Sequence, residues 1–295
     1  MLPHKPLHFS EYADEIDLFE PCDTVKSDGH DKERLVAELL DYLQDPVQVF
    51  ERRSNQPLFS KRQLLRGVLN TLAPYTLNAD AIEQLNHLLQ LELREKAIAR
   101  TQHLEMESKI RVGDTKVLVW QGDITTLNTD AIVNAANNQL LGCFQPLHAC
   151  IDNVIHSAAG VQLRDDCYTI IQKQGFVEPT GTAKITRAYN LPSRFVLHTV
   201  GPVVRAQVTE KNRADLAGTY ISCLEICKEI NTIQSIAFCG ISTGVFDYPP
   251  EEAAKVAFNN VVSWLKNNMG CLDLIIFNVF SDKDKNIYKS LVEAL

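Results

Sequence analysis

Two cysteines and a histidine lie within eight residues of one another in the segment CFQPLHAC. These residues are Cys143, His148 and Cys150. Their thiolate and imidazole groups are ligands that zinc prefers. Their spacing differs from that of common zinc fingers, and no second CxxC or HxxxH pair follows. Three protein ligands with one open position are typical of catalytic zinc. The spacing alone is equally compatible with two buried cysteines and a hydrogen-bonded core histidine.

A predicted helix begins directly after this segment and carries two further titratable groups. Asp152 and His156 are four residues apart, so a helix places both side chains on one face. Asp152 could act as a general base or orient a neighbouring group. His156 could equally be a histidine packed in the core.

Two polar corners precede the cysteine segment. In WQGDIT, Asp123 follows a short apolar run, where its carboxylate could accept hydrogen bonds from an exocyclic amine. A turn aspartate that caps the next segment has the same pattern. In NAANNQLLG (residues 134–142), three asparagines flank two alanines. Because asparagine tolerates left-handed backbone, this corner could also be a plain loop.

The segment GISTGVFDYP follows another apolar run at residues 240–249. Its glycines and hydroxyl residues let backbone N–H groups converge, which makes a nest for phosphate oxygens. The string also matches the G-x-S-x-G elbow of serine hydrolases, with Ser242 as nucleophile. That interpretation fails, because no helix directly follows the serine and the last histidine is His198, before it. We therefore predict a phosphate-binding loop.

The elements that must position these residues alternate along the second part of the chain. Strands are expected at KVLVWQG, DAIVNAAN, TAKIT, FVLHTVG, SIAFCGI and LIIFNVF, and helices near residues 151–172, 212–229, 251–266 and 283–295. This order predicts an α/β fold with a parallel or mixed sheet covered on both faces. Ligands of such sheets bind beyond the carboxyl ends of the strands, where the motifs above fall.

The first hundred residues have a different pattern. Leucines recur at helical spacing in three segments, with prolines between them, and no strand is expected. Asn78 or Asp80 could cap the third helix. Nothing in this helical region indicates chemistry.

Composition narrows the classes of function. Hydrophobic residues make up 45% and charged residues 22% of the 295 residues, and no apolar run approaches the length of about 20 needed to cross a bilayer. A net charge of −8 argues against nucleic-acid or anionic-membrane partners. Eight scattered cysteines and the absence of a signal pattern predict a reduced, cytoplasmic protein. No G-x-G-x-x-G or Walker sequence is present.

The chain resembles the macrodomain family over roughly residues 107–295. The resemblance rests on five segments, which are, in this order, QGDIT, IVNAAN, IDNVIHSAAG, HTVGP and GISTGVFDYP. The resemblance implies a three-layer α/β/α fold with a mixed central sheet. Most hydrolytic macrodomains carry a glycine-rich loop where this chain has LGCFQPLHAC. That replacement is similar to a zinc-containing class, which typically has a helical extension before the macrodomain. We accordingly expect a helical region at residues 1–105 and a macrodomain at residues 106–295.

The resemblance also implies roles for individual residues. Asp123 would bind the adenine amine and Ile124 would offer a backbone contact nearby, while Phe280 is a weaker candidate for stacking on adenine. Asn137 would orient the distal ribose, and Asp152 matches the aspartate that activates water. The pyrophosphate and distal ribose would be held by Ser242, Thr243, Gly244, Val245 and Phe246, and Zn²⁺ by Cys143, His148 and Cys150. Zinc could replace Asp152 in activating water.

The implied activity is zinc-dependent hydrolytic removal of mono-ADP-ribose from a modified protein. The class resembles partners of a sirtuin-type ADP-ribosyltransferase that modifies a lipoyl-carrier protein. Three alternatives remain open: a reader that binds ADP-ribose without removing it, an esterase acting on O-acetyl-ADP-ribose, and a purely structural zinc.

Overall fold

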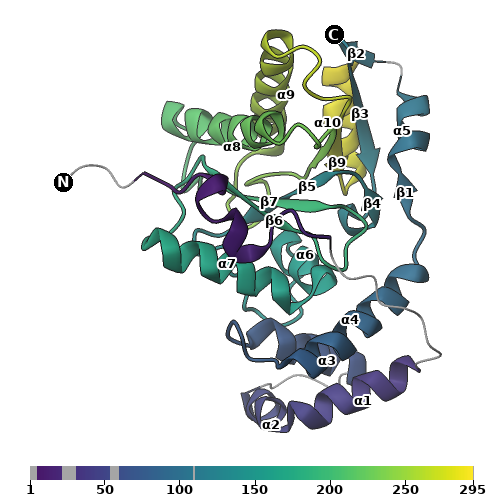
Figure 1. Cartoon of the computed structure of the whole chain (residues 1–295). Coiled ribbons are helices and arrows are strands. Elements are labelled where there is room, and N and C mark those ends of the chain that lie inside the picture. Colours follow the sequence, from purple (N-terminus) through teal and green to yellow (C-terminus); the bar gives the residue numbers. More distant parts are fainter. Residues whose placement is uncertain (1–4, 22–30, 54–59, 109, 295) are drawn as a thin grey trace.

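A mixed seven-stranded sheet forms the centre of the computed structural model, which describes residues 5–21, 31–53, 60–108 and 110–294 (Figure 1). In spatial order the strands are β2 (Ile110–Val112), β3 (Thr115–Gln121), β9 (Leu274–Val279), β8 (Ser235–Phe238), β5 (Ala131–Ala136), β7 (Phe195–Val200) and β6 (Ala183–Arg187). The five inner strands are parallel, and the edge strands β2 and β6 are antiparallel to their neighbours. The six strands expected from the sequence are confirmed, and β2 is an addition.

Helices cover both faces of this sheet, which gives the three layers expected (Figure 1). One layer contains α8 (Glu210–Glu229), α9 (Pro250–Asn267) and α10 (Asp282–Val292), and the other contains α6 (Ile151–Ala159) and α7 (Val161–Gln174). The single long helix predicted over residues 151–172 is wrong. Gly160 has a φ of 101°, which divides α6 from α7 because a right-handed helix requires a negative φ.

The inner strands are apolar almost throughout, since both of their faces are buried. Because the five inner strands are parallel, the carboxyl ends of β3, β5, β7, β8 and β9 lie at one edge of the sheet. The loops that leave this edge begin at Gly122, Asn137, Gly201, Cys239 and Phe280, and they build the site described below.

The N-terminal helices form a second apolar core of their own. They are α1 (Lys32–Tyr42), α2 (Gln44–Arg53), α3 (Lys61–Thr71) and α4 (Ala79–Arg94), joined mainly by leucines. The side chain of Asn78 accepts from the Ala81 N–H at 2.9 Å, which confirms Asn78 as the cap of α4. The expectation of no strand is wrong, because β1 (Ala99–Arg100) pairs with β4 (Leu127–Asn128) just before α5 (Thr101–Glu107).

Residues 5–21 return to the main core rather than to the helical region. Two short 3-10 helices, η1 (Phe9–Glu11) and η2 (Ala13–Ile16), lie against α7 and β6 (Figure 1). The buried Tyr12 hydroxyl accepts from the Ile185 N–H at 2.9 Å. This segment therefore belongs to the hydrophobic core around the seven-stranded sheet.

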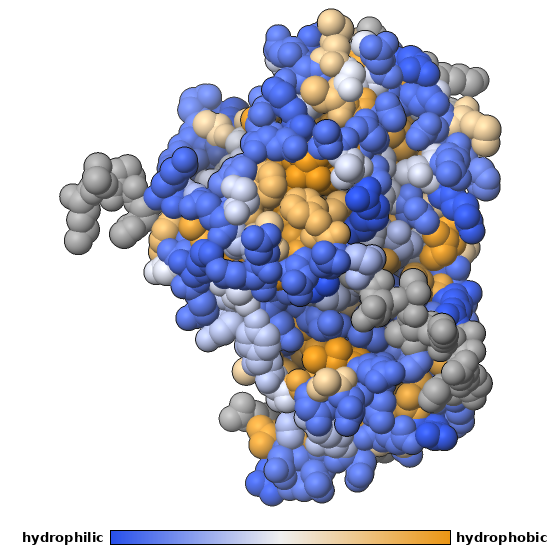
Figure 2. All heavy atoms as spheres, viewed as in Figure 1, coloured by the Kyte–Doolittle hydropathy of each residue, from blue (hydrophilic) through white to orange (hydrophobic). Residues whose placement is uncertain are grey.

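The face of the molecule drawn in Figure 2 is mostly hydrophilic, with separate hydrophobic patches. Among the described helices, none is both long and apolar enough to cross a membrane.

Candidate active site

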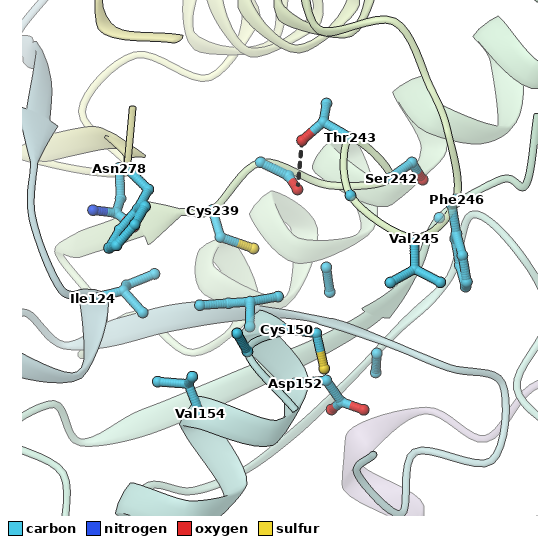
Figure 3. A pocket seen from close by; sticks show the side chains of 18 of the residues that line it. Ile124, Cys150, Asp152, Val154, Cys239, Ser242, Thr243, Val245, Phe246 and Asn278 are labelled. Atoms are coloured by element: carbon cyan, nitrogen blue, oxygen red, sulfur yellow. Dashed lines mark hydrogen bonds between the residues drawn. The ribbon is translucent and has the colours of Figure 1, made fainter. Parts of the chain in front are cut away.

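A cavity of about 1110 Å³ opens at the carboxyl edge of the sheet, a size that accommodates a nucleotide-sized ligand. It is lined by every residue to which the resemblance assigned a binding, catalytic or metal-ligating role: Asp123, Ile124, Asn137, Cys143, His148, Cys150, Asp152, Ser242, Thr243, Gly244, Val245, Phe246 and Phe280. Figure 3 shows Ile124, Val154 and Asn278 toward one end and Cys150 and Asp152 toward the other. The four motifs therefore face one cavity.

The metal-ligand candidates converge at the second end. The ligand atoms of Cys143, His148 and Cys150 all lie within 4.8 Å of one another, and each residue is half-buried. Cys143 Sγ is 3.6 Å from His148 Nδ1. With Zn–S near 2.3 Å and Zn–N near 2.0 Å, a tetrahedral ion separates these two atoms by about 3.5 Å, close to the distance observed. The cluster could hold a metal ion, and its soft donors fit zinc.

The conformation of residues 143–150, the cysteine loop, depends on the first turn of α6. Cys150 is the N-cap of this helix, where its Sγ accepts from the Asn153 N–H at 3.4 Å. The side-chain amide of Asn153 donates to the carbonyls of Cys143 and Gln145, at 3.3 and 3.0 Å. Burial and the neighbouring Cys143 together raise the pKa of the Cys150 thiol to about 11, against the opposing effect of the hydrogen bond from the Asn153 N–H. A coordinated metal would reverse this by stabilising the thiolate.

Asp152 lies beside the cluster, deep in the cavity wall. Its Oδ1 accepts from Asn134 Nδ2 at 2.8 Å, and its Oδ2 is 3.5 Å from Asn137 Nδ2. Burial raises its pKa to about 6, against the opposing effects of the Asn134 hydrogen bond and the Arg164 charge. The carboxyl group is thus oriented by two asparagines and poised to exchange a proton near neutrality.

A second buried group of metal-ligand types, made by His156, Cys167 and His198, lies behind Asp152. Both ring nitrogens of His198 already have partners: Nδ1 contacts Asn134 at 3.2 Å and Nε2 contacts the Thr186 hydroxyl at 3.0 Å. Burial lowers the pKa of His198 to about 3, which keeps it neutral. These contacts indicate a buried polar network that supports Asn134. His156 is buried, in agreement with a core histidine.

The loop at residues 240–246 presents its backbone to the cavity. Within the described residues, the N–H groups of residues 242–246 donate to no protein acceptor, and Ser242 has a φ of 65°. The turn is closed by the N–H of Tyr248, which donates to the Ser242 carbonyl at 3.0 Å. Such a row of free N–H groups is a nest for an anion. Val245 and Phe246 lie on the same loop, and Val245 is largely exposed (Figure 3).

Glycine is required where this loop meets the end of β7. A Cβ at Gly201 would lie 2.0 Å from Ser242 Oγ, far inside van der Waals contact. Gly142 is constrained in a similar way, since it has a φ of 80° and its Cβ would lie 2.9 Å from the His156 ring. Both positions let the backbone approach a buried side chain closely.

Asp123 has the capping role that one of the two interpretations of the sequence predicted. Its Oδ1 caps η3 (Ile124–Thr126) by accepting from the Thr125 N–H at 3.0 Å, while Oδ2 lies 3.4 Å from Lys96 Nζ. Asn278 donates to the Gly122 carbonyl at 3.0 Å and so fixes the turn before Asp123. Phe280, 84% exposed, lies at the same rim of the cavity.

Sequence reasoning missed several residues that shape the site. Asn134 was part of a quoted motif without a role of its own, and Asn153 and Asn278 were passed over. Their signal was present in outline, because Asn134 and Asn278 are polar residues within otherwise apolar strands and Asn153 lies in the first turn of a helix. Lys96 had no local signal, because it reaches the site from the end of α4.

Comparisons with known proteins agree with this geometry. Residues 133–257 match the family described as Macro domain. A protein-ADP-ribose hydrolase of Treponema medium is 48% identical over 229 residues, an alignment that covers 78% of this chain and 86% of that protein. The chain belongs to the macrodomain family. A relative of the same name from Staphylococcus aureus (strain MSSA476) is 53% identical over 174 residues, which span 59% of this macrodomain chain and 65% of the relative.

Solved macrodomains share the fold of this one. The macrodomain of Oceanobacillus iheyensis with ADP is 36% identical, with a TM-score of 0.57 over 62% of this chain and 93% of that chain. A variant of the same protein with ADPR is 37% identical, with a TM-score of 0.57 over 62% and 95%. The Trypanosoma brucei macrodomain in complex with ADP is 26% identical, with a TM-score of 0.55 over 78% and 96%.

Proposed function

We propose that this macrodomain is a zinc-dependent hydrolase that removes mono-ADP-ribose from a modified protein. One observation carries the proposal: the Cys143, His148 and Cys150 cluster faces the same cavity as the free N–H groups of residues 242–246. A ligand held by its diphosphate in that nest would extend toward the cluster. The names of the Treponema and Staphylococcus relatives, both protein-ADP-ribose hydrolases, support this activity.

In this proposal the cavity binds ADP-ribose along its length. Asp123 Oδ2 accepts from the adenine amine, and Ile124 contacts the base with its backbone. The diphosphate accepts from the N–H groups of Ser242, Thr243, Gly244 and Val245, and Phe246 packs on the distal ribose. Backbone donors suit this acidic protein, because they attract a dianion without side-chain cations.

The reacting end would be formed by the metal cluster and Asp152. Cys143, His148 and Cys150 would hold a zinc ion, which would supply Lewis acidity at this end of the cavity. Asn137 orients the distal ribose, since its side chain lies on the Asp152 side of the cavity. Asp152 accepts a proton from the attacking water as the water oxygen bonds to the anomeric carbon and the bond from that carbon to the modified protein side chain breaks. The departing side chain then takes up the proton that Asp152 holds. The products are free ADP-ribose and the unmodified protein.

The proposal extends to a cellular context. We infer a lipoyl-carrier protein as substrate and a sirtuin-type ADP-ribosyltransferase as the enzyme that modifies it, acting in the cytoplasm. A relative from Fusarium oxysporum f. sp. cubense, 39% identical over 245 residues, is named a probable bifunctional ADP-ribose hydrolase/ADP-ribosyltransferase. That name supports a coupling between removal and addition of the same group. The free thiols of the seven described cysteines support a reducing compartment.

The deciding experiment measures release of ADP-ribose from a modified lipoyl-carrier protein, with metal analysis of the purified enzyme. We expect one equivalent of zinc, turnover with the metal present, loss of turnover after chelation and recovery on zinc addition. A reader would leave the label in place under every condition. Full activity of a metal-free, folded protein would refute the zinc mechanism, and faster turnover of O-acetyl-ADP-ribose would favour an esterase.

A further inference from the structure

Helix α3 of the N-terminal region lies next to α6 (Figure 1). Near its end, Asn70 contacts Leu147 of the cysteine loop, 77 residues away in sequence. The Asn70 side chain, only 3% exposed, accepts from the Leu147 N–H at 3.0 Å. The same side chain donates to the Ser157 hydroxyl on α6 at 3.0 Å. Asn70 therefore joins the loop to the helix that begins at Cys150.

Leu147 needs such a partner. It directly precedes His148 and has a φ of 56°, a left-handed conformation that is unfavourable for a leucine. Strain of this kind persists only where the surroundings fix the backbone. Because Asn70 holds the N–H group of Leu147, it also limits where the next residue can place its imidazole.

A second contact from α3 reaches the loop through one intermediate residue. Arg66 Nη2 donates to Asn153 Oδ1 at 3.0 Å, and the Asn153 amide donates to the carbonyls of Cys143 and Gln145. Arg66 and Asn70 are four residues apart, so they lie on one face of α3. The apolar residues of α3, among them Leu65 and Val68, pack instead into the core of the helical region.

Arg164 on α7 forms hydrogen bonds with backbone carbonyls at the end of α3. Its guanidinium donates to the carbonyls of Leu69 in α3 and of Leu72, the C-cap of α3, at 3.0 and 2.7 Å, and to that of Leu141 at 2.8 Å. It also lies 4.7 Å from the centroid of the Phe144 ring. The end of α3 and both sides of the first cysteine are thus tied to one buried cation.

We infer that α3 fixes the conformation of the cysteine loop and that Asn70 is a positioning residue for His148. This inference rests on the proposed zinc site and assigns a task to the N-terminal helices. Groups that orient metal ligands typically change metal affinity by 10–100-fold when removed, because the ligands must then be ordered at the moment of binding.

The test compares Asn70→Ala with Thr71→Ala in the full-length protein. Thr71 is the exposed neighbour of Asn70, and its hydroxyl donates to Val68 of its own helix. Zinc affinity is measured by competition with a colorimetric chelator, and folding by circular dichroism. We expect about tenfold weaker zinc binding for Asn70→Ala and no change for Thr71→Ala. Asn70→Asp keeps an acceptor for the Leu147 N–H and should recover most of the affinity.

Hydrogen exchange of metal-free protein separates this inference from the zinc proposal. Amides of residues 143–149 should exchange several-fold faster in Asn70→Ala than in the wild type, whatever the metal does. A wild type that binds no zinc would refute the zinc site. The exchange rates would still show whether Asn70 on α3 orders the cysteine loop. Equal affinity and equal exchange in both variants would overturn this inference. If Asn70→Ala does not fold, Asn70→Ser, too short to reach Leu147, replaces it.

Discussion

The side-chain amide of Asn134 donates a 2.8 Å hydrogen bond to Asp152 Oδ1, and both side chains are buried. The second proton of the same amide points to His198 Nδ1 at 3.2 Å. Asn134 therefore links the carboxylate at the cavity wall to the polar network behind it. This leaves Oδ2 of Asp152 on the side of Asn137, where the proposed ribose site lies.

Replacement of Asn134 should impair the reaction more than ligand binding. In Asn134→Ala the Asp152 carboxylate loses the donor that orients it, a change worth about 1.5–3 kcal/mol for a charged partner, or roughly 10–100-fold in kcat. Affinity for free ADP-ribose, measured by calorimetry, should change little. The control is Asn138→Ala, because that side chain is exposed. A variant that retains full kcat would argue against this role of Asn134.

The sequence predicted the convergence of the site well, for a physical reason. Parallel strands end at one edge, so motifs that follow different strands must meet there, as Asp123 and Ser242 do. The three metal-ligand candidates lie in one short loop, so their proximity needed only the local chain. The capping role of Asn78 was likewise local.

Contacts between distant segments could not be predicted in the same way. Asn70 and Lys96 reach the site from the N-terminal helices, and no local pattern encodes how one helix packs against another domain. The strand β1 is two residues long, too short to show alternation. The break at Gly160 was missed although glycine commonly ends helices, because apolar residues follow it directly; its φ of 101° marks the end of α6.

Removal of one thiolate should separate metal binding from nucleotide binding. In Cys150→Ser the hydroxyl still caps α6, but the preferred soft ligand is lost. We expect loss of zinc and of turnover, with free ADP-ribose affinity preserved because the loop at residues 240–246 is untouched. Cys271→Ser, a half-buried cysteine outside the cavity, is the matched control. Parallel losses of binding and activity would contradict this division of labour.

The reverse separation is expected at the end of β7. In Gly201→Ala the new methyl group would meet Ser242 Oγ at 2.0 Å and push the loop at residues 240–246 out of place. ADP-ribose affinity should fall by at least about tenfold, the effect of losing one charge-assisted hydrogen bond, while zinc content stays at the wild-type level. Val203→Ala, on the exposed part of the same connection, should bind normally. Normal ADP-ribose binding by Gly201→Ala would remove this loop from the binding site.

The buried carboxyl group of Asp166 should make the folded protein less stable as the pH rises. Burial raises its pKa to about 7, although a hydrogen bond of 2.5 Å from the Tyr189 hydroxyl opposes this. Between the unfolded pKa of about 4 and the folded pKa, only the folded state keeps the proton, so the free energy of unfolding falls with rising pH by up to about 1.4 kcal/mol per unit. Asp166→Asn resembles the protonated form and should reduce the loss of stability between pH 5 and pH 8 in urea titrations, whereas Asp273→Asn, an exposed control, should not. An unchanged pH dependence in Asp166→Asn would show that this carboxyl group ionises alike in both states.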